Sequence, residues 1–204
     1  MKIIDLLEWE DVEDWSIDDY TPYGTYQFVQ DLISNGQETE ITDQMINYIA
    51  TDPQSAKDYA CIVINRPFPV GEDAIATNAS CSYSYAKLAL KGKRFKKGEP
   101  VIMVGGSRYA YLYARYILKK QWPAAEPYIA KVPEDYIEYL WFIYKGKIPH
   151  TIIRKFLLDS LTVSDLTKKQ YDYWVKELFP TSSLLVNKWI RFGDRLRGRI
   201  NESN

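Results

Sequence analysis

The chain contains few of the residues that usually carry out catalysis or bind metal ions. Among its 204 residues it has a single histidine, His150, and two cysteines, Cys61 and Cys81. One histidine nearly excludes a Ser-His-Asp triad or a histidine-rich metal site. Because the two cysteines do not form a CxxC pair, we expect reduced thiols. We therefore predict no catalytic residue, no metal and no cofactor.

Long apolar runs and glycine-rich phosphate loops are also missing. No apolar run approaches the roughly 18 residues that a membrane-spanning helix needs. The start, MKIIDLLEWEDVEDW, lacks the basic flank and cleavage site of a secretory signal, so we expect a soluble, cytoplasmic protein without a membrane partner. Neither GxxxxGKS/T nor GxGxxG occurs. The Gly105-Gly106 doublet is interpreted as a helix-entry turn, with an anion site at its amides as the alternative.

Acidic and basic residues are separated along the chain, although the net charge is only −1. Residues 1–58 hold 14 acidic and 2 basic side chains, whereas residues 59–204 hold 13 acidic and 24 basic ones. Between Lys87 and Lys120 there are ten basic residues and one acidic residue, Glu99. A chain polarised in this way usually has a charged partner, or folds one end against the other.

A unit of about 27 residues recurs through the middle of the sequence, which is the pattern of a repeat protein. Copies begin at Ile49, Ile75, Ile102 and Ile129. A glutamate and an aromatic residue recur with a spacing of 27 residues, and a tyrosine followed by alanine or leucine recurs with a similar spacing. These positions are Glu72, Glu99 and Glu126; Phe68, Phe95 and Trp122; and Tyr59-Ala60, Tyr85-Ala86, Tyr113-Ala114 and Tyr139-Leu140.

Each copy predicts a longer helix followed by a short one. Asp52-Pro53, Asn78 and Ser107 are the expected starts of the longer helices, because small polar residues cap helix N-termini and proline suits the first turn. Each longer helix is expected to end in a basic or glycine-containing turn. The Glu-Pro pairs at Glu99 and Glu126 predict the first turn of the short helices.

A unit this small cannot bury its apolar face alone, so we expect the copies to stack. The sequence thus predicts an all-α fold, an α-solenoid-like array of short-helix and long-helix repeats with atypical ends, forming one continuous unit. Residues 1–48 are predicted to be an acidic cap with a degenerate copy at Tyr26–Gly36, residues 49–148 the array, and residues 149–204 a basic helical cap. In this last cap, Ser164-Asp165 and Ser182-Ser183 are expected to begin helices, and Pro180 to end one.

The repeat resembles a pattern found in other proteins. Tyr113-Ala114, a basic turn, and then Trp122-Pro123-Ala124-Ala125-Glu126-Pro127-Tyr128-Ile129 are similar to short helical repeats of uncharacterised bacteriophage and other mobile-element proteins. The resemblance covers roughly residues 49–148, with Gly71-Glu72-Asp73 and Lys96 as departures. It implies a phage or mobile-element origin, and hence the host cytoplasm, but no particular reaction.

The recurring glutamates and aromatic residues are interpreted as structural. A 27-residue spacing places one carboxylate at an equivalent point of every copy, where it can cap backbone amides or pair with a neighbouring cation. Tyrosines and tryptophans at helical spacing usually form the core. The alternative, acid-base chemistry by paired carboxylates, has no further support in the sequence.

Stacking of the copies would produce a basic, tyrosine-lined face. Aligned on the repeated tyrosine, Lys87 falls over Arg115, Lys91 over Lys119 and Tyr83 over Tyr111, and within each helix these residues are four apart. Such a face could bind an acidic protein or nucleic-acid phosphates, or it could be a solvated helix surface. The complete candidate binding set is Tyr83, Lys87, Lys91, Lys93, Arg94, Lys96, Lys97, Tyr111, Arg115, Lys119 and Lys145.

We conclude from the sequence that the chain is a noncatalytic interaction protein whose partner is a host or element protein. The alternative is a helical-repeat protein that binds nucleic acid through the same face. An enzyme using dispersed carboxylates, for example in residues 150–204, is a third hypothesis without positive support. The acidic N-terminal segment, residues 1–58, could also cover the basic face itself. The acidic start, Glu8 to Asp19 with Trp9 and Trp15, is open to two interpretations: a solvated cap, or a docking element for a basic partner.

Overall fold

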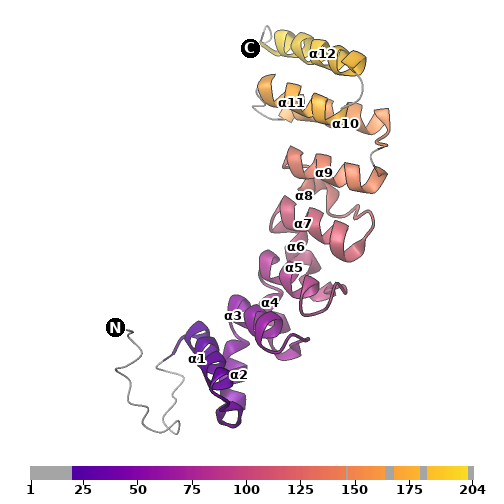
Figure 1. The fold of residues 1–204 in the computed structure, drawn as a ribbon. Coiled ribbons are helices and arrows are strands. Elements are labelled where there is room, and N and C mark those ends of the chain that lie inside the picture. The colour runs from indigo at the N-terminus through magenta and orange to yellow at the C-terminus, as the bar shows by residue number, and fades with distance from the viewer. Residues whose placement is uncertain (1–19, 146, 164–167, 180–182, 202–204) are drawn as a thin grey trace. The chain divides into compact units, whose positions relative to one another are not determined.

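The described part of the structure is entirely helical, which confirms the predicted all-α class. The computed structural model describes residues 20–145, 147–163, 168–179 and 183–201, and every regular element in these ranges is a helix (Figure 1). The chain divides into two compact units, with the boundary between Lys119 and Lys120. No helix in the described ranges has the length and apolar character needed to cross a membrane.

The first unit consists of short helices. Its α-helices are α1 (Pro22–Ser34), α2 (Asp43–Ile49), α3 (Pro53–Asp58), α4 (Glu72–Ile75), α5 (Ala79–Lys87), α6 (Glu99–Val104) and α7 (Ser107–Tyr113). Between them lie the 3-10 turns η3 (Glu38–Glu40), η5 (Pro69–Gly71) and η6 (Lys96–Gly98). Two π-helical turns, η4 (Tyr59–Val63) and η7 (Ala114–Leu118), extend α3 and α7.

The second unit has longer helices around a separate core. It contains α8 (Glu126–Ile129), α9 (Pro133–Tyr144), α10 (His150–Val163), α11 (Lys168–Leu178) and α12 (Ser183–Asn201). Its core includes Ile137, Leu157, Tyr171, Trp174 and Val175, all buried. The expected caps at Ser164-Asp165, the break at Pro180 and the start at Ser182 fall outside the described residues, while Ser183 is the first residue of α12.

Small polar side chains begin the longer helices, as the sequence predicts for the first two copies. Asp52 Oδ2 accepts a hydrogen bond from Ser55 N at 2.7 Å, and Asn78 Oδ1 accepts one from Cys81 N at 3.1 Å. The prediction for the third copy is wrong by one residue, because Gly106 is the N-cap and Ser107 is already helical. Gly106 has a φ of 152°, a conformation that is open to glycine because it lacks a Cβ.

The longer helices end in a left-handed residue six positions after the repeated tyrosine. In the first three copies a backbone N–H reaches back five residues, for example Leu90 N to Tyr85 O at 3.0 Å, which widens the last turn. The left-handed residues are Asn65, Lys91, Lys119 and Lys145, with φ values of 46°, 54°, 54° and 49°. Asparagine adopts this conformation more readily than lysine, so the three lysines are held there by their surroundings.

Three tyrosine hydroxyls make the same pair of hydrogen bonds. Each accepts a hydrogen bond from the backbone N–H of the aromatic residue in the loop that precedes its helix. Each donates a hydrogen bond to the glutamate that begins the short helix between that loop and its own helix. All six distances lie between 2.8 and 3.0 Å. All three tyrosines are 0% exposed. The sets are Tyr85 with Phe68 and Glu72, Tyr113 with Phe95 and Glu99, and Tyr139 with Trp122 and Glu126.

Within the first unit, equivalent positions of successive copies touch one another. Helix α3 packs against α5, and α5 packs against α7. Cys81 Sγ donates to Gln54 Oε1 at 3.5 Å, and these two residues are 27 positions apart. Lys91 likewise donates to Asn65, so that the left-handed positions of two copies meet. The copies therefore lie in register in this unit, whereas their stacking into an extended solenoid stays a prediction.

Removing one tyrosine hydroxyl should destabilise the fold. In Tyr113→Phe the Phe95 N–H loses its buried partner, and leaving such a group unsatisfied costs about 1–3 kcal/mol, whereas the Glu99 carboxylate keeps its two hydrogen bonds with Arg94. Urea unfolding followed by circular dichroism would measure the loss. Tyr116→Phe is the matched control, because Tyr116 is 42% exposed and should change stability little. Equal stability of Tyr113→Phe and the wild type would refute the structural role of this hydroxyl.

The same cluster predicts loss of stability at alkaline pH. Burial, followed by the adjacent glutamate, raises the pKa of Tyr85 and Tyr139 above the ordinary value of 10.0. The folded state thus favours the neutral hydroxyl, so its contribution is intact below about pH 10 and declines as pH rises further. Denaturant titrations from pH 8 to 11 should show this decline, with a smaller slope in Tyr85→Phe. If stability fell with pH as steeply in Tyr85→Phe as in the wild type, the Tyr85 hydroxyl would not be a source of the decline.

Candidate functional site

The predicted cations are exposed on the surface at the ends of the longer helices. Lys87 is the last residue of α5, Arg115 lies in η7, and both are exposed. Lys91, Lys119 and Lys145 occupy the exposed left-handed positions described above, with Lys145 in the second unit. The structure thus brings Lys87, Lys91, Arg115 and Lys119 onto the connected elements α5, η7 and the turns that follow them.

The two tyrosines of the predicted face lie beneath the cations and not on the surface. Tyr83 is 8% exposed and Tyr111 is 0% exposed, because α5 and α7 pack against neighbouring helices on that side. Lys87 Nζ lies 5.6 Å from the ring centre of Tyr83, and the guanidinium carbons of Arg108 and Arg115 lie 5.4 and 5.9 Å from that of Tyr111. The expectation of a tyrosine-lined face is therefore wrong for these two residues, which instead support the cations from below.

An exposed tyrosine that the sequence analysis missed lies between two of the cations. Tyr116 is 42% exposed, and its ring centre lies 5.3 Å from Lys87 Nζ and 5.2 Å from the Arg115 guanidinium carbon. Cation–π contacts at exposed sites contribute about 0.5–1 kcal/mol each and restrict the side chains involved. The sequence analysis missed Tyr116 because it assumed regular helical spacing. The π-helical turn η7 displaces Tyr116 from the position that this spacing assigns to it.

The basic loop between α5 and α6 is partly neutralised by acidic side chains. Arg94 makes two hydrogen bonds of 2.8 Å with the Glu99 carboxylate, and Lys97 Nζ lies 2.5 Å from Asp73 Oδ1. Exposed ion pairs contribute little to stability, but they lower the charge available to a partner. Lys93 and Lys96 are exposed on the same loop. Two of the four predicted cations of this loop are therefore paired with acidic side chains.

We define the cationic face as Lys87, Lys91, Arg108, Arg115 and Lys119 together with Tyr116. Within the described part of the chain, Lys87 and Lys119 form no ion pair, and Lys91 bonds the neutral side chain of Asn65. Because helices and their capping turns carry these side chains, the positive charges project from a rigid backbone. Such a surface can recognise an anion.

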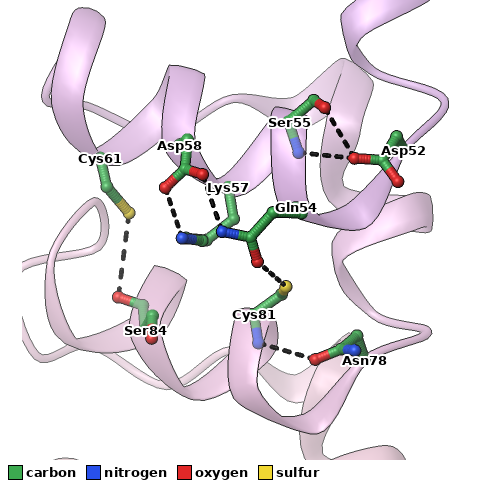
Figure 2. A network of polar contacts seen from close by, with 9 residues as sticks. All are labelled: Asp52, Gln54, Ser55, Lys57, Asp58, Cys61, Asn78, Cys81 and Ser84. Atoms are coloured by element: carbon green, nitrogen blue, oxygen red, sulfur yellow. Dashed lines mark hydrogen bonds and ion pairs between the residues drawn. The ribbon is translucent and has the colours of Figure 1, made fainter. Parts of the chain in front are cut away.

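The two cysteines belong to a polar network between neighbouring copies. Figure 2 shows Gln54 between Asp58 and Cys81, with Gln54 Nε2 2.8 Å from Asp58 Oδ2, and Lys57 paired with the same carboxylate. Burial raises the pKa of both the Cys61 and the Cys81 thiol. Burial thus favours the neutral thiols, which are poor nucleophiles. The hydrogen bond between Gln54 and Cys81 connects α3 to α5.

The carboxylates provide no alternative centre. Glu72, Glu99 and Glu126 are each committed to the hydroxyl of a buried tyrosine, and Glu126 also accepts from Gln121 at 2.7 Å. No group of three or more histidine, cysteine, aspartate or glutamate residues suited to a metal ion occurs among the described residues. The cationic face is thus the arrangement in this part of the chain with the clearest binding chemistry.

Comparisons with family models, curated proteins and solved structures find no match to this chain.

The raised thiol pKa values predict slow alkylation in the folded protein. At pH 7.5 iodoacetamide should modify Cys81, which is 2% exposed, far more slowly than the same residue in urea, and Cys61 should also be retarded. Mass spectrometry of timed samples would give both rates. Modification of Cys61 faster than a free thiol such as glutathione would show an activated cysteine and would contradict the structural interpretation.

Proposed function

We propose that this chain is a noncatalytic helical-repeat interaction protein whose cationic face binds an acidic surface of another protein. The observation that carries the proposal is the contact of Lys87 and Arg115 with the exposed Tyr116 ring. Positive charges held on a rigid surface attract acidic partners and orient them. An aromatic ring between the charges adds contact area of the kind that dominates many interfaces.

The repeat extends this proposal to the whole array. The in-register contacts Gln54–Cys81 and Asn65–Lys91 support stacking of the copies as an α-solenoid. In such an array, side chains at equivalent positions of successive copies line up and form an extended surface. The resemblance of the repeat to phage and mobile-element proteins leads us to propose that the chain inhibits or redirects a host or element protein.

Nucleic acid is the second candidate, because Tyr116 could stack on an unpaired base while Lys87 and Arg115 contact phosphates. Two observations favour the protein partner. The overall net charge is −1, and two cations of the neighbouring loop are paired with Glu99 and Asp73. Binding to nucleic acid would weaken steeply with salt concentration.

Affinity capture from a bacterial lysate at physiological salt, with and without nuclease, tests the two candidates. We expect a discrete protein that survives nuclease and is lost when Lys87, Lys91, Arg115 and Lys119 are all changed to glutamate. The matched control changes four exposed lysines of the second unit, Lys131, Lys147, Lys176 and Lys188, to glutamate and should capture the same protein.

Three outcomes discriminate the possibilities in this experiment. Recovery of nucleic acid that disappears after nuclease would favour the second candidate. Equal capture by the cationic-face variant and the wild type would exclude this face as the binding surface. Loss of capture by both glutamate variants would show a general charge effect and would also contradict a specific role for the cationic face.

A further inference from the structure

Three large apolar side chains are exposed at the same position of three successive copies. Ile62, Leu88 and Tyr116 each lie three residues after the repeated tyrosine, and they are 61%, 49% and 42% exposed. Ile62 and Tyr116 are in the π-helical turns η4 and η7, and Leu88 directly follows α5. The widened turn accounts for the exposure, because the extra residue in the turn displaces this position from the buried side of the helix.

These residues form a row on neighbouring elements, which we call the apolar strip. Turn η4 packs against α5, and α5 packs against η7. Cations border the strip, with Lys87 directly before Leu88, Arg115 directly before Tyr116, and Lys91 and Lys119 three residues beyond. Single exposed apolar side chains are ordinary, but a row of equivalent ones beside positive charges indicates a docking surface for a chain that is both apolar and acidic.

The first 19 residues of the chain have this composition. They contain eight acidic residues and one basic residue, Lys2. Apolar residues are interleaved with the carboxylates throughout, and they include two tryptophans, Trp9 and Trp15. A segment that only needed to be solvated would not require so many large apolar side chains. The segment therefore matches the strip in charge of opposite sign and in apolar character.

The segment is also long enough to reach the strip from its point of attachment. It joins the described structure at Tyr20, directly before α1, and α1 packs against α3. From α1 through α3 and α5 to α7 there are three steps between packed helices, about 30 Å at the usual spacing of about 10 Å. Nineteen extended residues span up to about 60 Å. Residues 1–19 are therefore long enough to contact the apolar strip.

We propose that residues 1–19 dock on the apolar strip of the same molecule. Their tryptophans and aliphatic side chains cover Ile62, Leu88 and Tyr116, and their carboxylates face Lys87, Lys91, Arg115 and Lys119. The segment thereby competes with an acidic partner for the cationic face. Only this competition rests on the proposed function, since the docking itself depends on this chain alone.

Zero-length cross-linking of the full chain tests the docking directly. A carbodiimide joins a carboxylate to a lysine amine only when the two are in contact, and peptide mapping then identifies the pairs. We expect carboxylates of residues 5–19 to be joined to Lys87, Lys91 and Lys119 within a monomer. Cross-links spread evenly over Lys131, Lys147, Lys176 and Lys188 as well would overturn the proposal, as would products that are exclusively dimers.

A binding measurement separates apolar contact from simple charge attraction. A labelled peptide of residues 1–19 is titrated with the full chain in which the eight acidic residues at positions 1–19 are replaced by asparagine or glutamine. Fluorescence anisotropy should show binding that Leu88→Ser with Tyr116→Ser weakens at least about tenfold. Val104→Ser, which removes an apolar side chain that is 55% exposed at the end of α6, is the matched control and should bind normally.

Competition within the molecule gives a further expected result. The wild-type chain should bind the labelled peptide at least about tenfold more weakly than the neutralised chain, because its own segment is present at a high effective concentration. Equal binding by the two chains would overturn docking in cis. So would equal binding by the Leu88→Ser, Tyr116→Ser variant and by the Val104→Ser control.

These results can be distinguished from failure of the proposed function. Cross-links to Lys87 and Lys119 without any captured partner would support the docking and contradict the interaction role. Capture of a partner that depends on the cationic face, together with no cross-links to it, would leave the interaction role standing and overturn the docking.

Discussion

The hydrogen bonds of the repeated tyrosine hydroxyl are the constraint on which the rest of the structure depends. Tyr85, Tyr113 and Tyr139 each accept a hydrogen bond from a loop amide that would otherwise be unsatisfied, and each donates one to a glutamate carboxylate. Unsatisfied buried groups of this kind cost more than a typical hydrogen bond contributes, so the tyrosine is difficult to replace. Its hydroxyl consequently connects the longer helix that carries it to the preceding loop and to the start of the short helix after that loop.

The surface chemistry follows from the way the longer helices end in the first three copies. There the residues after the repeated tyrosine leave the core through a widened turn that ends in a left-handed residue. That turn presents Ile62, Leu88 and Tyr116 to solvent and places cations beside them. The cationic face and the apolar strip are thus by-products of helix termination in each copy, and a partner or the chain's own acidic start can bind to a surface that folding already supplies.

Prediction from sequence succeeded where the determining interactions are local. Asp52 and Asn78 cap their helices because a side chain needs only to reach an amide three residues away. The structural role of Glu72, Glu99 and Glu126 followed from their spacing, although their partner, a tyrosine hydroxyl 13 or 14 residues along the chain, did not. The exposure of Tyr116 was missed because a regular helical period was assumed where the helix widens. The burial of Tyr83 and Tyr111 was missed because it depends on neighbouring helices that pack on that side of α5 and α7.

By itself, the sequence determined the helical class, the 27-residue spacing and the separation of charge, because composition and periodicity are properties of the chain alone. Tertiary structure decided which side of each helix is buried, and therefore which tyrosines support the cations and which one reaches solvent. It also decided that Lys91 and Lys119 adopt a left-handed conformation that their residue type disfavours. Which side of each helix is buried depends on the packing of α3, α5 and α7 against one another, which no single copy contains.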